Sequence, residues 1–520
     1  MEQVTAVAKK YTKNHDCNAI IIPVFSDEKD DQLFQDYNEL LGKSLQQTLD
    51  ENKFLREEDT FTLFYTNKKT KAKLIALVGL GKKADLSLEK LRQLGGKSYS
   101  YFASKDVQSV ALPLIKVDKL KDTDLVTTEK IAKTLTEGFL LAAYDYDRFK
   151  SKKDDKENKD KTENKNNKET KKKINTLQVL AMSDSEIAKI SQVITFAITV
   201  VTNVNLVRDL INGPPSVVVP ETMAMVAKKE LTNKPFTKVT IFDKKQLEKM
   251  NMQCILGVCS GSVNEPRLLQ LEYSPPKANK TIAIVGKGVT FDSGGINLKP
   301  TGYIETMKDD MSGAALVIAL VKTAAELKLP IKIIGLAPCV ENMPSGSAIK
   351  PGDVLISASG KTIEVGNTDA EGRLILADAL HYATSFKPDY IIDLATLTGA
   401  CVVALGSLCS AIMSKDELLK SAMMKASKET NEKVWELPLI EEYRDDIKSD
   451  IADLKNIGAG KGEAGSITAG LFLSEFVGDY KWMHIDIAGP VWTYKGSAYT
   501  QKGATGYGLR LLTQFLIDLK

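Results

Sequence analysis

The fold of this chain is organised around one stretch, Gly366-Asn367-Thr368-Asp369-Ala370-Glu371-Gly372-Arg373-Leu374. Its two carboxylates are two residues apart, a guanidinium follows them, and an apolar helical pattern continues from Leu374 to Tyr382. A spacing of two aims both side chains the same way only in extended backbone, so the stretch predicts a strand-to-helix turn. The alternative is that Asp369 and Glu371 only cap the helix and complement its dipole.

The length and composition indicate a globular protein of several domains. A chain of 520 residues is longer than one hydrophobic core usually supports. Hydrophobic residues make up 43% of it and charged residues 26%, which is ordinary for a soluble protein. Residues 1–14 are polar, no apolar run reaches about 18 residues, and the scattered cysteines form no CxxC pair. We therefore expect a cytoplasmic protein with reduced thiols and no membrane partner.

Residues 151–173 form a segment of low complexity. They include ten lysines and six acidic residues, with asparagine and no apolar side chain. Such a segment cannot bury enough surface to offset the entropy of ordering, so we expect a disordered insertion in a surface loop. Without its charge of +4, the net charge of the chain changes from +3 to −1. The net charge therefore predicts no nucleic-acid partner.

Alternating β-like and helical patterns predict an α/β fold with two domains. The first domain covers residues 1–184, and a helical pattern over residues 185–212 ends at a Gly-Pro-Pro breaker and predicts a connecting helix. Residues 213–520 predict a second α/β domain with a central mixed sheet. We expect its strands at residues 238–242, 254–257, 268–273, 281–286, 331–338, 390–395, 411–414 and 482–487.

Charged residues gather at the ends of apolar strands in the second domain, where open α/β sheets place their ligands. The strand Thr281–Gly286 runs into Lys287, Lys299 follows on a loop, and Asp310 precedes a helix. Each alone has an ordinary interpretation, as a solvated lysine or a helix N-cap. Together the segments would gather four carboxylates in one pocket: Asp292, Asp310, Asp369 and Glu371. Such a pocket repels itself unless cations compensate, so it predicts a site for divalent metals.

Other hydrolase classes fit less well. The three histidines, His15, His381 and His484, lie outside these segments, and there is no HExxH or GxSxG sequence. A histidine-based zinc peptidase is therefore excluded, and a serine hydrolase has no support. A two-metal phosphoesterase remains an alternative, but it needs basic groups for a polyanion, and the chain without its insertion is net negative.

Five motifs of the second half resemble those of the leucine aminopeptidases (cytosol aminopeptidases). They are Gly286–Gly295, Lys308–Gly313, Asn367–Leu374, Asp393–Ala400 and His484–Pro490. The resemblance implies a metal-dependent aminopeptidase that removes Leu, or a similar apolar first residue, from short peptides with a free N-terminus. It also implies a macro-like N-terminal α/β domain, a C-terminal catalytic domain, and a homohexamer built as a dimer of trimers.

By that resemblance, two divalent ions per subunit are bound by Lys287, Asp292, Asp310, Asp369 and Glu371. Asp292 and Glu371 would bridge the ions, which are Zn²⁺ or Mn²⁺, with Mg²⁺ and Co²⁺ as further candidates. The main-chain carbonyl of Asp369 would assist. A lysine ligand must be neutral, and lowering its pKa from about 10.4 by about three units costs roughly 4 kcal/mol, which two adjacent dications could supply.

The resemblance also implies the roles of the remaining site residues. Lys299 would stabilise the developing oxyanion without binding metal, and Arg373 would hold a bicarbonate ion that acts as general base. The pocket for the first side chain, with one backbone contact at Leu397, would consist of Met307, Thr396, Gly399 and Ala488. An apolar pocket separates Leu poorly from Met, since one methylene is worth only about 1 to 3 kcal/mol.

Two features leave alternatives open. Residues 458–465 are rich in glycine where relatives often have an arginine, and Ala469-Gly470 replaces two alanines. We expect these departures to affect loops or subunit contacts rather than the metal chemistry. The N-terminal domain could be a binding module for ADP-ribose, but residues 18–183 show no ligand fingerprint, so we expect a mainly structural role.

Overall fold

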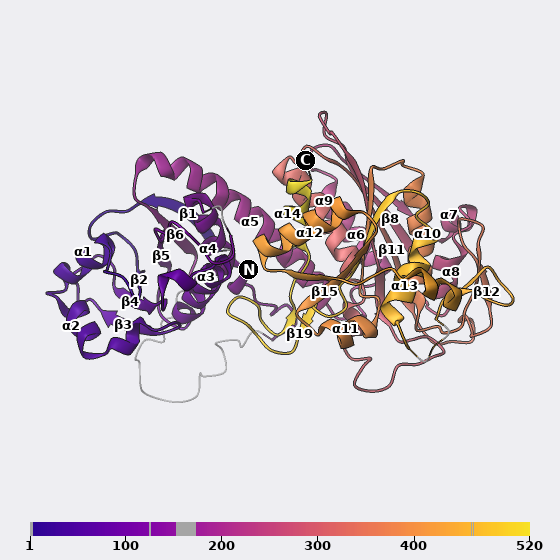
Figure 1. Cartoon of the computed structure of the whole chain (residues 1–520), viewed down its shortest axis with the longest axis horizontal. Helices are drawn as coiled ribbons and strands as arrows, with labels where there is room; N and C mark the ends of the chain where they lie inside the picture. Colours follow the sequence, from indigo (N-terminus) through magenta and orange to yellow (C-terminus); the bar gives the residue numbers. More distant parts are fainter. Residues whose placement is uncertain (1–3, 124–125, 152–172, 459, 461, 520) are drawn as a thin grey trace, which may run out of the picture. The chain divides into compact units, whose positions relative to one another are not determined.

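The structure is a computed structural model that describes residues 4–123, 126–151, 173–458, 460 and 462–519. Contacts divide the chain into two compact units, Met1–Val201 with Gly496–Gln501 and Thr202–Lys495 with Lys502–Lys520. Each unit has an α/β fold, as the sequence predicts (Figure 1). The predicted insertion lies, except for its two end residues, outside the described residues. The domain boundaries expected at residues 184 and 212 stay a prediction.

The first unit is built on a six-stranded sheet with the order β1-β6-β5-β2-β4-β3. All neighbours are parallel except β3 and β4. The strands are β1 (Thr5–Lys10), β2 (Ala19–Val24), β3 (Phe61–Tyr65), β4 (Leu74–Gly79), β5 (Ser109–Pro113) and β6 (Thr176–Ala181), and the main helices are α1 (Gln32–Leu40), α2 (Ser44–Glu51), α3 (Leu88–Ala103) and α4 (Thr128–Ala142). Sequence patterns predict strands here at residues 19–25, 60–65, 73–80, 107–114 and 176–182. They missed β1, because an edge strand needs little apolar surface and most of its residues are at least partly exposed.

Helix α5 (Asp184–Asn212) follows β6. Among the described residues it is the one helix that is long and apolar enough to cross a membrane, and 44% of its most apolar window is buried. Core helices of globular proteins pass the same test of length and composition. Arg208, near its C-terminal end, is buried and donates from Nε to the main-chain oxygen of Thr505 at 2.9 Å. Its last turns are therefore fixed by contacts within the second unit.

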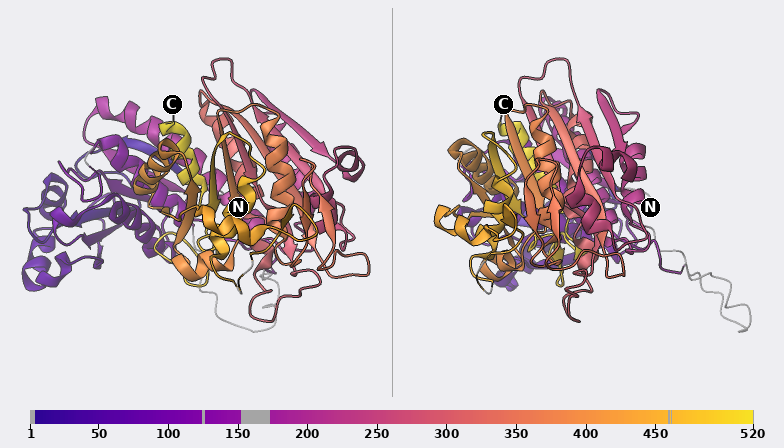
Figure 2. Two further views of the ribbon diagram at one scale, coloured as in Figure 1. Left: turned by 45° about the vertical axis from the view of Figure 1, so that its right-hand side comes forward. Right: turned by 90° about the vertical axis from the view of Figure 1, so that its right-hand side faces the viewer.

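The second unit contains a nine-stranded mixed sheet with the order β16-β15-β18-β14-β9-β11-β8-β7, and β10 also pairs with β11. Figure 2 shows strands of this sheet side by side from two further directions. Its central strands β18, β14, β9 and β11 are mutually parallel. The strands are β7 (Thr237–Phe242), β8 (Arg267–Tyr273), β9 (Thr281–Gly286), β10 (Gly288–Asp292), β11 (Lys332–Asn342), β14 (Tyr390–Ala395), β15 (Cys409–Ser414), β16 (Lys433–Glu436) and β18 (Lys481–Asp486). The predicted mixed sheet is thus confirmed.

Helices cover both faces of this sheet. On one face Ala283 and Val285 of β9 pack into a core cluster with Leu374 and other residues of α10. On the other, Gly335 of β11 lies so close to α9 that an added Cβ would be 2.7 Å from Val317 Cγ1. The helices are α6 (Pro220–Leu231), α7 (Lys244–Lys249), α8 (Gln253–Cys259), α9 (Ser312–Leu327), α10 (Glu371–Thr384), α11 (Gly399–Leu405), α12 (Glu417–Thr430), α13 (Gly465–Ser474) and α14 (Leu509–Asp518).

The strand predicted at residues 254–257 is wrong, because these residues lie in helix α8. A short apolar run fits a buried strand and a buried helix equally well. Here Asp378 of α10 decides between them: its Oδ2 accepts from the main-chain N–H groups of Cys254 and Ile255, both at 3.0 Å. These N–H groups belong to the first turn of a helix, which lacks internal acceptors for them.

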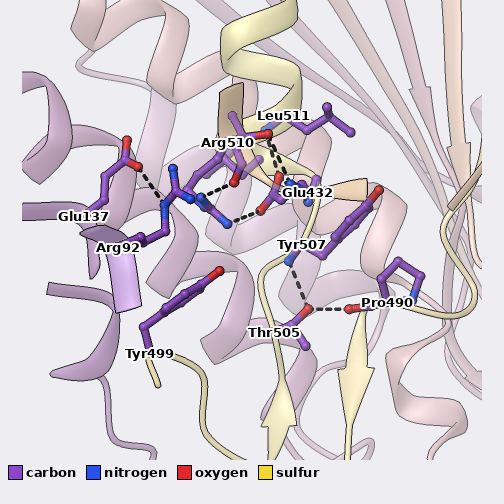
Figure 3. A network of polar contacts seen from close by, with 12 residues as sticks. Arg92, Glu137, Glu432, Pro490, Tyr499, Thr505, Tyr507, Arg510 and Leu511 are labelled. Carbon is purple, nitrogen blue, oxygen red and sulfur yellow. Dashed lines mark hydrogen bonds and ion pairs between the residues drawn. The ribbon is translucent and has the colours of Figure 1, made fainter. Parts of the chain in front are cut away.

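The C-terminal helix α14 is fixed at its start by a buried carboxylate (Figure 3). Glu432 Oε2 accepts from Gly508 N at 3.1 Å and from Leu511 N at 2.8 Å. Its Oε1 lies 3.3 Å from Arg510 Nη2, and Arg510 also donates to Thr430 O at 2.8 Å. One side chain therefore supplies the acceptors for the first turn of α14.

We predict that Glu432→Ala lowers the free energy of unfolding of the second unit by about 3 kcal/mol, because it removes one partner of a buried ion pair. Denaturation by urea measures this, followed by tryptophan fluorescence, since Trp435, Trp482 and Trp492 all lie in this unit. The matched control is Glu436→Ala, which removes an exposed partner of Lys420 and should cost less than about 1 kcal/mol. Equal losses in the two variants would contradict the capping role.

Candidate metal centre and active site

Three of the predicted site residues, Lys287, Thr396 and Ala488, follow the carboxyl ends of three parallel strands. In the register of β9, β14 and β18, Gly286 lies opposite Leu394, and Ala395 lies opposite Asp486. Parallel strands end at the same edge of a sheet, which is where α/β proteins usually bind ligands. The segments that follow the three strands therefore meet at this edge, although they are distant in sequence. Their first residues are Lys287, Thr396 and Ile487.

Lys287 lies between β9 and β10, and its ammonium group joins two carboxylates. Nζ is 2.8 Å from Asp310 Oδ1 and 2.8 Å from Glu371 Oε1, and it donates to Thr396 O at 2.9 Å. Gly372 makes this position accessible, because a Cβ there would lie 2.6 Å from Lys287 Cε. The glycine after Glu371 is thus required by the path of the lysine.

Lys299 joins a second pair of carboxylates from the loop after β10. Its Nζ is 2.9 Å from Asp292 Oδ2 and 2.5 Å from Asp369 Oδ1. The loop turns at Gly294 and Gly295, whose φ angles of +87° and +65° lie in the left-handed region that favours glycine. The alternative interpretation of Lys287 and Lys299 as solvated loop charges is therefore wrong, because both form ion pairs in the site.

Asp310 lies between the short helix η3 (Met307–Asp309) and α9. Its Oδ1 accepts from Thr396 Oγ1 at 2.7 Å, and its Oδ2 is buried without a hydrogen-bond partner. No side chain caps α9, whose N-cap residue is Met311. The interpretation of Asp310 as a helix cap is therefore wrong.

The stretch Gly366–Leu374 leads from strand β13 (Thr362–Glu364) into α10, which begins at Glu371. Asp369 stands in a turn rather than in extended backbone, and α10 has no side-chain cap. The strand-to-helix turn is confirmed, but its extended backbone is wrong. The side-chain cap of the alternative is wrong too, although Glu371 does lie in the first turn, where it complements the helix dipole. A turn followed at once by helix brings the carboxylates of Asp369 and Glu371 to one site.

Asparagine side chains hold these segments in place, and sequence reasoning missed them. Asn342, at the end of β11, donates from Nδ2 to Asp292 Oδ1 at 2.8 Å and to Thr368 O at 2.9 Å. Asn456 accepts at Oδ1 from Gly366 N at 2.8 Å and donates from Nδ2 to Asn367 O at 2.7 Å. A polar residue ending the apolar strand β11 is the one signal that could have indicated Asn342.

Burial and charge together set the protonation of the site. Burial acts to lower the pKa of Lys287, but Asp310 and Glu371 outweigh it and raise the pKa overall. Burial also acts to lower the pKa of Lys299, but the carboxylates around it outweigh burial and raise this pKa. Burial raises the pKa of Asp369 to about 7, with Asp292 adding to it, and raises that of Asp310 well above its usual range. The lysines are therefore protonated, and two carboxyl groups bind protons more readily than usual.

The side chains present fit divalent metal ions. Ligand oxygens of Asp292, Asp369 and Glu371 all lie within 4.8 Å of one another. Glu371 Oε2 and Asp310 Oδ2 are buried without hydrogen-bond partners, and each is a free acceptor. If all four carboxylates ionise, they exceed the two ammonium groups by two charges. Oxygen-rich sites with a negative excess suit Mg²⁺, Mn²⁺ and Zn²⁺.

Arg373 is buried in the first turn of α10 and makes no ion pair with the described residues. Its Nε is buried without a hydrogen-bond partner. Burial lowers its pKa to about 10, although Glu371 and Asp486 act in the opposite direction, so the guanidinium stays charged at neutral pH. A buried cation of this kind fits a small bound anion.

The residues expected to bind substrate lie on the loops around this edge. Thr396 is bonded to Asp310, as described above, and Met307 belongs to η3. Leu397 and Ala488 both donate their main-chain N–H to Asp486 Oδ1, at 3.1 and 3.2 Å. Gly399 begins α11, is exposed, and has no atom within 4 Å of an added Cβ. Asp486 lies in the motif His484–Pro490, but the sequence analysis assigned it no role.

Comparison with known proteins gives two family matches along the chain. Residues 205–513 match the model described as "Cytosol aminopeptidase family, catalytic domain", and residues 21–153 match that family's N-terminal domain. A probable cytosol aminopeptidase of Geobacter sp. (strain M21) is 42% identical, over 96% of this chain and 97% of its own. One of Chlorobaculum tepidum is 48% identical, over 78% of this chain and 79% of its own.

Solved structures agree over almost the whole length. A mutant of tomato leucine aminopeptidase has a TM-score of 0.83 and 30% identity, and the match covers 99% of this chain and 96% of that one. The bottromycin maturation enzyme BotP in complex with Mn has a TM-score of 0.82 and 27% identity, covering 97% and 99%.

We predict that metal binding at this site releases protons and strengthens with rising pH. Lys287 must lose its proton to become a ligand, and Asp369 and Asp310 must be ionised. Titration calorimetry with Mn²⁺ or Zn²⁺ in buffers of different ionisation enthalpy, between about pH 6 and about pH 8, counts the protons. Lys287→Met should release about one proton fewer and bind more weakly. Affinity independent of pH, with no buffer-dependent heat, would contradict the ligand set.

Proposed function

The chain belongs to the cytosol aminopeptidase family and is a metal-dependent aminopeptidase, and on that premise we propose that it removes an apolar first residue, preferably Leu, from short peptides. The observation that carries the proposal is the cluster of four carboxylates bridged by Lys287 and Lys299. This arrangement offers ligands for two ions and a separate ammonium group at their edge. A phosphoesterase would need basic groups for a polyanion, and the chain without residues 151–173 is net negative.

We assign two metal positions to the chain's own residues. Asp292, Asp369 and Glu371, with the main-chain carbonyl of Asp369, would hold the more exchangeable ion. Lys287, Asp292, Asp310 and Glu371 would hold the tighter one, so that Asp292 and Glu371 bridge. Zn²⁺ and Mn²⁺ are the first candidates, followed by Mg²⁺ and Co²⁺. Bound there, two dications supply Lewis-acid chemistry: they lower the pKa of water and polarise a peptide carbonyl.

Lys299 would stabilise the oxyanion that develops on the substrate carbonyl. Its Nζ is held by Asp292 and Asp369, two proposed ligands of the exchangeable ion. It would therefore lie next to that ion, and as a protonated ammonium group it has no lone pair with which to bind it. An ammonium group fixed in a mostly buried site needs no reorganisation during the reaction.

Arg373 would hold a bicarbonate ion close to the metals, and the chemistry supplied by that ion is general-base catalysis. The support is the buried guanidinium, which makes no ion pair with a carboxylate of the described chain. No histidine is among the proposed metal ligands or beside Arg373 in the sequence to take this role. His484, which lies in the motif His484–Pro490, has its Nδ1 bonded to Asp393 at 2.6 Å.

Substrate specificity would arise from the loops at the strand ends. The free amino group of the peptide would meet Asp310, which restricts cleavage to first residues. The first side chain would enter the pocket lined by Met307, Thr396, Gly399 and Ala488, with Leu397 making a backbone contact. Such a pocket excludes charged side chains because it offers them no partner.

We further propose a cytoplasmic enzyme that assembles as a homohexamer, with no nucleic-acid or membrane partner. The support is the family membership and the near-neutral charge of the chain without residues 151–173. Residues 1–184, 185–212 and 213–520 would be its N-terminal domain, connecting helix and catalytic domain.

A panel of amino-acid amides tests the proposed function. After chelation and re-addition of single metals, leucine amide should be hydrolysed fastest, alanine amide more slowly, and glutamate or lysine amide hardly at all. Removing carbon dioxide from the buffer should lower the rate, and adding bicarbonate should restore it. Hydrolysis of a phosphodiester instead, or activity unchanged by chelation, would refute the proposal.

We predict different outcomes for two substitutions in the site. Lys299→Ala should retain both metals and lose about 10²- to 10³-fold in kcat, because it removes a donor to the oxyanion. Asp310→Ala should lose the tighter metal as well as the activity. Metal analysis after dialysis, together with initial rates on leucine amide, separates the two effects. Full activity of Lys299→Ala would show that the oxyanion assignment is wrong.

A further inference from the structure

Asp486, the last residue of β18, is fully buried and binds three donors from two loops. Oδ1 accepts from Leu397 N at 3.1 Å and from Ala488 N at 3.2 Å. Oδ2 accepts from Thr398 Oγ1 at 2.7 Å. Its surroundings therefore present donors to both carboxylate oxygens, and these come from the loops after β14 and after β18.

Thr398 extends this network to two helices. It is the N-cap of α11, where its Oγ1 accepts from Cys401 N at 3.1 Å. The same oxygen lies 2.8 Å from Ser466 Oγ, in the first turn of α13. One carboxylate thus connects the end of β18 with the start of α11 and, through Thr398, with α13.

The loops that Asp486 holds are those proposed to line the pocket for the first side chain. Gly399 is the residue after Thr398, and it has no side chain with which to hold its own position. Leu397 and Ala488 depend on Asp486 for a main-chain hydrogen bond. Small changes in these loops would alter the width of an apolar pocket, and one methylene there is worth about 10- to 200-fold in rate.

We propose that Asp486 is a positioning residue that sets the width of the first-residue pocket by holding Leu397, Thr398 and Ala488 together. This inference rests on the proposed function. Asp486 acts through main-chain and hydroxyl donors and has no assigned contact with metal or substrate. Its effect should therefore appear in substrate selectivity rather than in metal content.

A matched control is available on α10. Asp378 is also fully buried and also accepts three hydrogen bonds, from Cys254 N and Ile255 N at 3.0 Å and from Ala358 N at 2.7 Å. Its partners belong to α8 and to a loop that carries no proposed pocket residue. Substitution of Asp378 thus removes a buried carboxylate that does not bind the pocket loops, whereas substitution of Asp486 removes one that does.

The experiment measures kcat and KM of the metal-loaded full chain for leucine amide and alanine amide. In Asp486→Ala we expect a higher KM for leucine amide and a fall of about tenfold in the ratio of kcat/KM for leucine over alanine. Asp486→Asn keeps an oxygen that can accept from the two N–H groups, so the ratio should fall less in this variant. Asp378→Asn and Asp486→Asn should both lower the thermal midpoint, but Asp378→Asn should leave the ratio of kcat/KM for leucine over alanine unchanged.

Two variants of Thr398 keep the test decisive if Asp486→Ala does not fold. Thr398→Val removes the donor to Asp486 and should lower the ratio, whereas Thr398→Ser retains the hydroxyl and should restore it. If the ratio stays within about twofold of the wild type in Asp486→Asn and Thr398→Val, the inference is wrong while the proposed function stands. A wild-type chain that hydrolyses none of the amides would overturn both.

Discussion

Charge balance in a buried space is the constraint on which this structure depends. Four carboxylates meet at the carboxyl edge of the sheet, and burying them unpaired would cost far more than the fold can offset. Each lysine forms ion pairs with two of these carboxylates: Lys287 with Asp310 and Glu371, and Lys299 with Asp292 and Asp369. The two ammonium groups compensate two of the four negative charges. The remaining negative excess is what attracts dications.

Close backbone packing makes this arrangement of charges possible. A Cβ on Gly286 would lie 2.3 Å from Gly313 O, and a Cβ on Gly313 would lie 2.3 Å from Leu394 O. The start of α9 therefore rests directly on the ends of β9 and β14. Gly372 extends the same principle to α10, where it leaves room for Lys287. The glycines allow three elements to converge within the length of one lysine side chain.

Local patterns in the sequence predicted the charged residues of the site but not the polar side chains that hold their segments in place. Strand ends and motif spacing indicated Lys287 and the carboxylates, because each lies next to its own strand or helix. Asn456 acts on Gly366 across 90 residues, and no local pattern reports such a hydrogen bond. The strand predicted at residues 254–257 failed for a related reason: its helical state depends on Asp378, which lies 124 residues from Cys254.

Behind the charged centre, β14 and β18 carry a second tier of buried polar groups. Asp393 lies opposite His484 in their register, and it binds both His484 Nδ1 at 2.6 Å and Trp482 Nε1 at 2.7 Å. Two residues further along β18, on the same face, Asp486 binds the pocket loops. Both oxygens of Asp486 accept hydrogen bonds from the pocket loops, and its charge also acts on Arg373. The proposed metal ligands and the residue proposed to position the pocket loops are therefore different buried carboxylates.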